Sequence, residues 1–301
     1  MAKELSRAAG PLLKKIKLGL PKGSLQDSTF DLFRRAGFRV ELSLRSYFPS
    51  FDDPEIEAVM FRAQEISRYV EDGVVDAGLT GKDWICENGS EVIEVCELVY
   101  SKATVRPAQW VLAVPNESRV KKPEDLKGGI IATELVKVTK DYFARKHIEV
   151  KVEFSWGATE VKARMVDGIV EVTETGSSLQ ANNLRVVDTV MTSTTRLVAN
   201  KATWEDAFKR EKIEGVSLLL RGAIEGRQKV GLKLNLPVER LEEALKLLPA
   251  EKSPTVNNLA DKKFVAIEVV LEESAARDLV PKLKKVGGSG IFTYPLNQVI
   301  P

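Results

Sequence analysis

The sequence predicts an α/β protein with two lobes, followed by a smaller α+β domain. Short apolar runs alternate with amphipathic runs from Ile16 onward, which is typical of parallel strands connected by helices. The length of 301 residues suits about two domains. Near the C-terminus the pattern changes, because two strands there follow one another directly.

The first lobe is predicted to open with the strand IKLGL and the turn Pro21-Lys22-Gly23. A helix follows from Ser24, which can cap it, and Asp27 three residues later completes a capping-box arrangement. Gly37 is expected to end this helix. Its buried face consists of residues at helical spacing: Leu25, Thr29, Leu32, Phe33 and Ala36. A strand, a helix and a further strand come next: IEAVMF, EISRYVEDG and VVDAGLT.

The second lobe is predicted to open with the strand WVLAVP, and LRVVDTV and TRLVANK are expected to return the chain to the first lobe. A long polar-faced helix from Trp204 to about Gly226 would then connect the lobes to the last domain. The remaining predicted strands are VIEVCELVY, GIIAT, VKVEFS and GIVEV. We therefore expect four parts: an N-terminal extension over 1–15, a first lobe over 16–107 and 188–215, a second lobe over 108–187, and a connecting helix with the last domain over 216–301.

The last domain is predicted to have the element order βαββαβ, which is the ferredoxin-like pattern. The six segments, in order, are KVGLKLNL, PVERLEEALKLL, PTVNNL, FVAIEVVL, ESAARDLVPKLKKV and SGIFTYPL.

Composition excludes several classes of function. The 45 basic and 43 acidic residues leave a net charge of +2, so no overall field attracts nucleic acid or an anionic membrane. Two cysteines cannot form a disulfide framework, and no apolar run is long enough for a signal peptide or a membrane span, so we expect a cytoplasmic protein. His147 is the only histidine and lies at a predicted helix-to-strand turn, which argues against zinc sites and histidine-based triads.

The segment after the strand GIVEV has the composition of a phosphate-binding loop. Thr175, Gly176, Ser177 and Ser178 offer hydroxyls and backbone amides ahead of a helix predicted to begin at Leu179. Glu171 at the strand end could accept hydrogen bonds from two neighbouring ribose hydroxyls. An ordinary strand-to-helix turn explains the same residues, and the loop alone favours that simpler interpretation.

Other turns of similar composition strengthen the phosphate-site hypothesis. They are Gly157-Ala158-Thr159-Glu160 at a helix start, Pro21-Lys22-Gly23-Ser24 after the first strand, and the glycine-rich segment from Gly73 to Asp83. Gly73 itself is expected to end a helix. Ligands of α/β proteins bind where parallel strands end, so we expect these turns to contribute to one site.

These residues resemble those of the ATP phosphoribosyltransferase family. The segments that carry the resemblance are PKGSL, RAQEISRYVEDGVVDAGLTGKDW, IATE, GATEV and, most specifically, GIVEVTETGSSL. The C-terminal segments LLP, SPT and GGSGI are similar to the regulatory domain of the long form of that family. The resemblance runs from about Ile16 to the C-terminus.

The resemblance implies a two-lobed, type II periplasmic-binding-protein-like catalytic fold with a C-terminal ferredoxin-like (ACT-like) domain. It implies transfer of phosphoribosyl from phosphoribosyl pyrophosphate to N1 of the ATP adenine, with release of pyrophosphate and a requirement for Mg²⁺. This reaction is the first step of histidine biosynthesis. The resemblance further implies a homohexamer that histidine inhibits through the C-terminal domain.

The resemblance also suggests roles for individual residues. Lys22 and Glu171 are expected to act in catalysis, with Glu171 in the place of an acid, usually aspartate, that contacts the ribose. Where the family often has an arginine after PKG this chain has Ser24, and Arg45 or Arg62 is expected to supply that charge. The other expected substrate contacts are Gly23, Ser24, Thr80, Gly81, Asp83, Glu160, Thr173, Thr175, Gly176, Ser177 and Ser178. Histidine is expected near Asn235, Thr255, Ser289 and Gly290. No metal-binding side chain is assigned.

Two other functions fit parts of the sequence. Two-lobed folds of this class also capture small solutes for transport, but no signal peptide is recognisable here. An amino-acid sensor that has lost catalysis would account for Ser24 in place of arginine. The enzyme remains the favoured interpretation.

Overall fold

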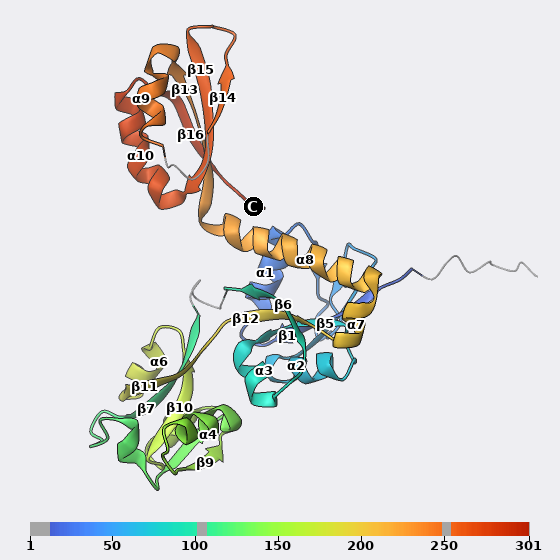
Figure 1. Cartoon of the computed structure of the whole chain (residues 1–301), viewed down its shortest axis with the longest axis vertical. Coiled ribbons are helices and arrows are strands. Elements are labelled where there is room, and N and C mark those ends of the chain that lie inside the picture. Colours follow the sequence, from blue (N-terminus) through green and yellow to red (C-terminus); the bar gives the residue numbers. More distant parts are fainter. Residues whose placement is uncertain (1–12, 101–106, 249–253, 301) are drawn as a thin grey trace, which may run out of the picture. The chain divides into compact units, whose positions relative to one another are not determined.

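The computed structural model describes residues 13–100, 107–248 and 254–300. The chain divides into two compact units, Met1–Ser217 and Leu218–Pro301 (Figure 1). Most of the expected N-terminal extension, residues 1–12, lies outside the described residues. The first unit contains two five-stranded sheets, and the second contains one four-stranded sheet.

The first sheet has the strand order β4-β1-β5-β12-β6. Its strands are β1 (Ile16–Lys22), β4 (Ile56–Arg62), β5 (Ala77–Gly81), β6 (Ile93–Leu98) and β12 (Thr195–Ala199). Its helices are α1 (Gln26–Arg35), α2 (Ala63–Glu71) and α3 (Lys82–Asn88). β1 runs parallel to β4 and β5, as expected, but β12 is antiparallel to both of its neighbours. The expected parallel arrangement is therefore confirmed for β1, β4 and β5 but not for β12, which enters from the second sheet after only one intervening residue.

The second sheet has the order β11-β7-β10-β8-β9 and is mixed in the same way. Its strands are β7 (Ala108–Pro115), β8 (Ile130–Thr133), β9 (Lys151–Phe154), β10 (Gly168–Thr173) and β11 (Leu184–Ser193). Its helices are α4 (Val136–Arg145), α5 (Thr159–Lys162) and α6 (Ser177–Ala181). β10 pairs in parallel with β8 and antiparallel with β7. The position and direction of every strand that carries an expected substrate-contact residue are thereby defined.

Two expectations about helix starts require correction. Ser24 does not cap α1, because Gly23 turns the chain with a φ of +104° and the helix begins at Gln26, with Leu25 in the cap position. The helix after the loop begins at Ser177 and not at Leu179.

The expected connecting helix is two helices, α7 (Lys201–Glu205) and α8 (Ala207–Glu225), separated by Asp206. α7 starts before Trp204 because the Asn200 side chain accepts a hydrogen bond from the amide of Thr203, which caps it.

The C-terminal unit confirms the predicted βαββαβ order. It contains β13 (Lys229–Pro237), α9 (Leu241–Leu245), β14 (Thr255–Asn258), β15 (Phe264–Glu272), α10 (Glu273–Lys285) and β16 (Ser289–Pro295). The strands form an antiparallel sheet in the order β14-β15-β13-β16, and α9 and α10 cover one face of it (Figure 1). The helix predicted over PVERLEEALKLL is shorter than expected, since its first turn is the 3₁₀ segment Val238–Arg240.

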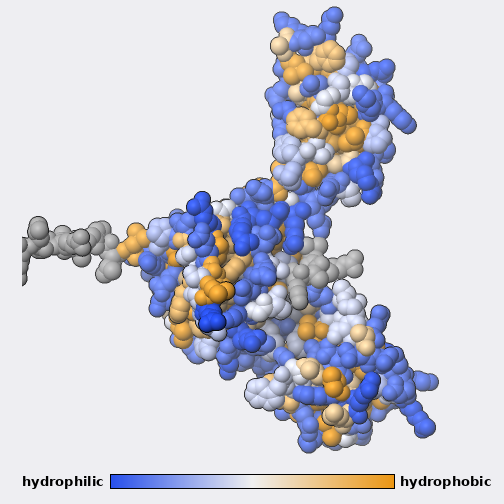
Figure 2. Space-filling model, turned by 180° about the vertical axis from the view of Figure 1, so that it is seen from behind, coloured by the Kyte–Doolittle hydropathy of each residue, from blue (hydrophilic) through white to orange (hydrophobic). Residues whose placement is uncertain are grey.

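Hydrophilic residues cover most of the described surface visible in Figure 2, with single hydrophobic residues between them. Within the described residues, no helix combines the length and apolarity needed to cross a bilayer. The sole histidine, His147, is exposed at a turn with a φ of +57°, as its sequence position predicted.

The buried Gly78 in β5 should tolerate no side chain. A Cβ at this position would lie 2.5 Å from Cγ2 of Ile66, which packs from α2 with no exposed surface. We expect Gly78→Ala to lower the free energy of unfolding by about 1–3 kcal/mol through overpacking. Gly215→Ala in α8 is the control, because no atom lies within 4 Å of its Cβ position and alanine favours the helix by about 1 kcal/mol. Thermal denaturation should therefore show opposite shifts in Tm, and equal shifts would contradict this account of Gly78.

Candidate active site

A cavity of about 290 Å³ lies within the first unit. Residues of both sheets line it, at the carboxyl ends of β1, β4, β5 and β10 and beside the point where β11 passes into β12. The polar lining residues are Lys22, Ser24, Arg62, Gln64, Asp83, Glu134, Glu171, Glu174, Ser193, Thr194 and Thr195, and the aromatic ones are Trp84, Tyr100 and Trp110.

Two cations share one part of this lining. Lys22 and Arg62 end the neighbouring parallel strands β1 and β4 and lie directly opposite each other in the register. The space beside Gly23 is taken by Arg62, whose Nη1 lies 3.6 Å from the Cβ position of the glycine. Within the described part of the chain, neither cation forms an ion pair with a carboxylate. Their positive charge is therefore available to an anionic ligand.

Lys22 also contacts an aromatic ring. Its Nζ lies 3.5 Å from the centre of the Tyr47 ring. Hydrogen bonding and charge from Lys22 lower the pKa of the Tyr47 hydroxyl. Tyr47 thus holds the ammonium group beside the cavity without neutralising it.

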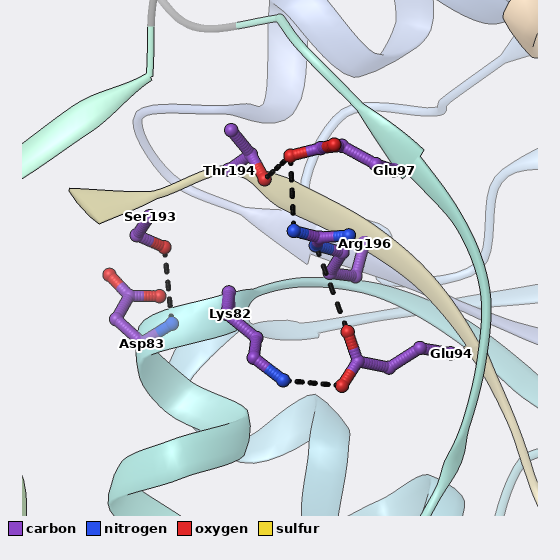
Figure 3. A network of polar contacts seen from close by, with 7 residues as sticks. All are labelled: Lys82, Asp83, Glu94, Glu97, Ser193, Thr194 and Arg196. Atoms are coloured by element: carbon purple, nitrogen blue, oxygen red, sulfur yellow. Dashed lines mark hydrogen bonds and ion pairs between the residues drawn. The ribbon is translucent and has the colours of Figure 1, made fainter. Parts of the chain in front are cut away.

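Asp83 is a buried acid in the cavity wall. Trp110 donates its Nε1 hydrogen to Oδ2 of Asp83 over 2.7 Å, and burial raises the pKa of this carboxyl group. The amide of Asp83 donates to Oγ of Ser193 over 3.1 Å (Figure 3). Asp83 therefore joins α3 to β7 and β11 of the second sheet.

Glu171 projects from β10 into the cavity lining and is half-buried. Burial raises the pKa of its carboxyl group, and the nearby carboxylates Glu160 and Glu134 raise it further. Hydrogen bonding with the Thr159 side chain lowers the pKa of this carboxyl group. The amide of Val172, whose nitrogen lies 2.9 Å from Oε1 of Glu171, also lowers it. Burial and neighbouring negative charge thus disfavour the ionised form of Glu171, and the groups that donate hydrogen bonds to its carboxylate favour that form.

The hydroxyl-rich loop after β10 is organised mainly by its own side chains. The amide of Gly176 donates to Oγ1 of Thr173 over 2.8 Å, and the hydroxyls of Thr175 and Ser177 lie 2.9 Å apart. Ser178 donates a hydrogen bond to Glu160, so the loop is joined to the start of α5. Gly176 has a φ of +77°, which a residue with a Cβ rarely adopts.

The structure brings six of the expected residues into the cavity lining: Lys22, Ser24, Arg62, Gly81, Asp83 and Glu171. The others are not among its lining residues: Gly23, Arg45, Thr80, Glu160, Thr173, Thr175, Gly176, Ser177 and Ser178. Of these, Thr80 is fully buried and donates to the carbonyl of Ala63 over 2.8 Å, and Arg45 is exposed with a φ of +65°.

Sequence reasoning did not identify the aromatic residues of the cavity or Glu134. Trp84 and Trp110 meet edge to face with ring centres 6.1 Å apart. Tyr100 is buried and bonded to Thr29. The position of Glu134, immediately after a predicted strand, was the one available signal, whereas the tryptophans resemble ordinary core residues in the sequence.

A network of polar contacts fixes the crossing between the two sheets (Figure 3). Thr194 accepts the amide hydrogen of Lys82 at its carbonyl over 2.9 Å, and its hydroxyl donates to Glu97 over 2.6 Å. Arg196 donates to the same Glu97 carboxylate over 3.0 Å. The chain between β11 and β12 is thus held beside the cavity.

Helix α3 also contacts the start of α4. Both carboxylate oxygens of Glu87 accept backbone amide hydrogens at 2.9 Å, one from Lys137 and one from Val138. Since Asp83 binds Trp110, two acids one turn apart on α3 both bind groups of the second sheet and its helices.

The fold and the cavity define a two-lobed α/β protein whose cavity is lined by two cations and several carboxylates, followed by a C-terminal α+β domain. The family model for ATP phosphoribosyltransferase matches residues 62–222, and the model for the C-terminal domain of the same family matches residues 226–298.

Named relatives match nearly the whole chain. The ATP phosphoribosyltransferase of Chlorobium phaeobacteroides is 56% identical over 286 residues, which cover 95% of this chain and 97% of the relative. That of Solibacter usitatus is 54% identical over 286 residues, with 95% and 99% covered. A solved ATP phosphoribosyl transferase from Thermotoga maritima, described as a HisG:HisZ complex, matches with a TM-score of 0.59 and 28% identity over 70% of this chain and 98% of that one. This chain belongs to the ATP phosphoribosyltransferase family and is an enzyme of that class.

Proposed function

We propose that the cavity between Lys22, Arg62 and Glu171 is where this enzyme transfers phosphoribosyl from phosphoribosyl pyrophosphate to N1 of ATP. One observation supports this site above all. Two cations without acidic partners among the described residues and one half-buried carboxylate line the same cavity in a chain of this family. The leaving group is an anion and the sugar becomes electron-poor, so the reaction needs both kinds of charge.

Lys22 and Arg62 stabilise the departing pyrophosphate. As the bond between C1 and oxygen breaks, negative charge grows on the leaving group and positive charge grows on the ribose. Cations that already face the cavity stabilise the first of these charges without rearrangement. N1 of adenine carries no proton to remove, so the reaction depends on positioning rather than on a general base.

Glu171 holds the ribose. An ionised carboxylate can accept hydrogen bonds from two neighbouring hydroxyls, and its negative charge favours the electron-poor sugar carbon. The loop residues Thr173, Thr175, Gly176, Ser177 and Ser178 bind the 5-phosphate, an assignment supported by their hydroxyls and by the left-handed conformation of Gly176. Trp84 and Tyr100 supply apolar surface for the adenine.

The carboxylates of the cavity fit Mg²⁺ that is bound together with substrate. Within the described residues, no group of three or more histidine, cysteine or acidic side chains is placed to hold a metal ion by itself. Mg²⁺ commonly binds through one or two carboxylates together with substrate phosphates. Glu134 and Glu171 are the residues that would hold it, and when bound it would neutralise charge on the leaving pyrophosphate.

The proposal includes feedback inhibition by histidine at the C-terminal domain of a cytoplasmic homohexamer. Asn235 and Ser289 face each other across β13 and β16, and Gly290 lies beside them, its Cβ position 3.5 Å from Nδ2 of Asn235. Thr255 lies on β14, which pairs with β15 on the other side of β13. Their shared sheet supports one effector surface.

One assay tests the proposal. The protein is mixed with ATP, phosphoribosyl pyrophosphate and Mg²⁺, and pyrophosphate release is followed with and without histidine. We expect release that histidine suppresses. Histidine binding without any release of pyrophosphate would instead identify an amino-acid sensor. The relatives disfavour this alternative, because those that match 95% of the chain are named ATP phosphoribosyltransferase.

A further inference from the structure

We propose that Asp83 is a positioning residue, which fixes the tryptophan pair Trp84 and Trp110 in the wall of the cavity. Gly81 makes room for its carboxylate. This inference rests on the function proposed above, in which Trp84 supplies apolar surface for the adenine of ATP. All four residues line the cavity, and the two tryptophan rings meet edge to face with their centres 6.1 Å apart.

The Asp83 carboxylate is hydrogen-bonded at both oxygens. Oδ2 accepts the Nε1 hydrogen of Trp110 over 2.7 Å, and Oδ1 accepts the amide hydrogen of Trp84 over 2.9 Å. Asp83 is only 6% exposed, although it borders the cavity. A carboxylate can only accept hydrogen bonds, and both oxygens of this one already do. Its contacts therefore favour support of the two tryptophans over direct contact with a substrate.

The packing at Gly81 shows how closely the carboxylate is held. A Cβ at this position would lie 2.0 Å from Oδ1 of Asp83, a distance that no real side chain could adopt without displacing the oxygen. Gly81 has a φ of −78° and a ψ of 148°, which any residue can adopt. The glycine is therefore required for the space that the carboxylate occupies and not for its backbone conformation.

The crossing between the two sheets fixes the backbone of Asp83. The first amide of α3, that of Lys82, donates to the carbonyl of Thr194 over 2.9 Å. The amide of Asp83 donates to Oγ of Ser193 over 3.1 Å (Figure 3). Ser193 ends β11, and β11 pairs with β7, which carries Trp110. The start of α3 and the strand of Trp110 are thus both attached to β11, which brings the indole to the carboxylate.

The consequence concerns Trp84, which is only partly buried. Trp110 is 2% exposed and belongs to the core of the second sheet, so its ring cannot turn without breaking the bond to Asp83. Trp84 packs against this ring and is bound to Asp83 through its own amide. An aromatic surface that is already fixed binds a planar ring without first ordering side chains, so Asp83 strengthens the binding of ATP.

Two variants remove the carboxylate from its place by different routes. Asp83→Ala deletes both acceptor oxygens, whereas Gly81→Ala keeps them and places a methyl group where Oδ1 lies. Ultraviolet resonance Raman spectra of the full-length protein report hydrogen bonding of indole N–H groups, and Trp110→Phe identifies the signal of Trp110 among the four tryptophans. We expect that signal to shift toward a weaker hydrogen bond in both variants. Combining the two should add no further shift, because Asp83→Ala leaves no carboxylate to displace.

Steady-state pyrophosphate release gives the second readout. We expect the KM for ATP to rise roughly two- to tenfold in both variants, in the range that a well-placed aromatic contact contributes. The KM for phosphoribosyl pyrophosphate should rise much less, because the groups proposed to bind that substrate remain in place. Asp31→Ala is the matched control, since Asp31 is an exposed aspartate of α1 outside the cavity lining, and it should change neither the signal nor either KM.

The two readouts together decide the proposal. An unmoved Trp110 signal in both variants would overturn it, and a higher KM for ATP in that case would make Asp83 a direct contact of the nucleotide. A shifted signal would also refute the proposal if both KM values rose equally or if neither rose. Absence of pyrophosphate release by the wild-type protein would refute the proposed function instead, and the spectra would still show whether Asp83 holds the indole.

Discussion

Glu171→Gln is expected to reduce kcat by about 10²- to 10³-fold, a loss comparable to that caused by removing one group that stabilises developing charge. Glutamine keeps the size of the side chain but not its negative charge, so it accepts fewer hydrogen bonds from the ribose. Steady-state pyrophosphate release measures the effect. Histidine binding, followed by calorimetry, should be unchanged, because the expected histidine residues belong to the other unit.

The wild-type pH profile provides a further check on Glu171. Burial raises the pKa of this carboxyl group in the folded protein, so activity should fall as the pH drops through a value above that of an ordinary glutamate. Glu171→Gln should have lost that limb. The control Glu153→Gln changes an exposed, ion-paired glutamate on β9 and should retain wild-type kcat. Retained activity in Glu171→Gln would show that Glu171 does not act in the reaction.

Arg62→Ala is expected to raise the KM for phosphoribosyl pyrophosphate roughly 10- to 100-fold, because a hydrogen bond to a charged group contributes about 1.5–3 kcal/mol. Arg62→Lys should recover only part of this, since an ammonium group cannot bind a phosphate through two parallel hydrogen bonds. Direct titration with pyrophosphate gives the same comparison without catalysis.

Arg68→Ala is the matched control for Arg62. It removes an exposed arginine from α2, six residues along the chain and outside the cavity lining. Its KM should equal that of the wild type. If Arg62→Ala also left the KM unchanged, the pyrophosphate group would not bind between Lys22 and Arg62. Another residue would then have to supply the positive charge that the family's arginine provides at the position of Ser24.

Much of the fold could be predicted from the sequence because its strands are short apolar runs between turn residues. Each segment predicted to be a strand forms one in the structure. For the last domain, the βαββαβ order alone was enough to predict the ferredoxin-like pattern. The reversed direction of β12 was not predictable from its own residues, since strand direction depends on where the chain enters the sheet. Ser24 shows a different limit, because a favourable cap residue has no effect once Gly23 delays the helix.

The presence of Lys22, Arg62 and Glu171 in the cavity lining was predictable, because each lies toward the carboxyl end of its strand. The aromatic wall of the cavity was not, because Trp110 lies inside an apolar strand and faces the cavity only through the pairing of β7 with β10.

The two acids of α3 have a consequence for substrate exchange. Asp83 and Glu87 anchor one short helix of the first sheet to Trp110 and to the first turn of α4. Any hinge motion that separates the lobes along this side must therefore break three hydrogen bonds at once or carry α3 with the second lobe.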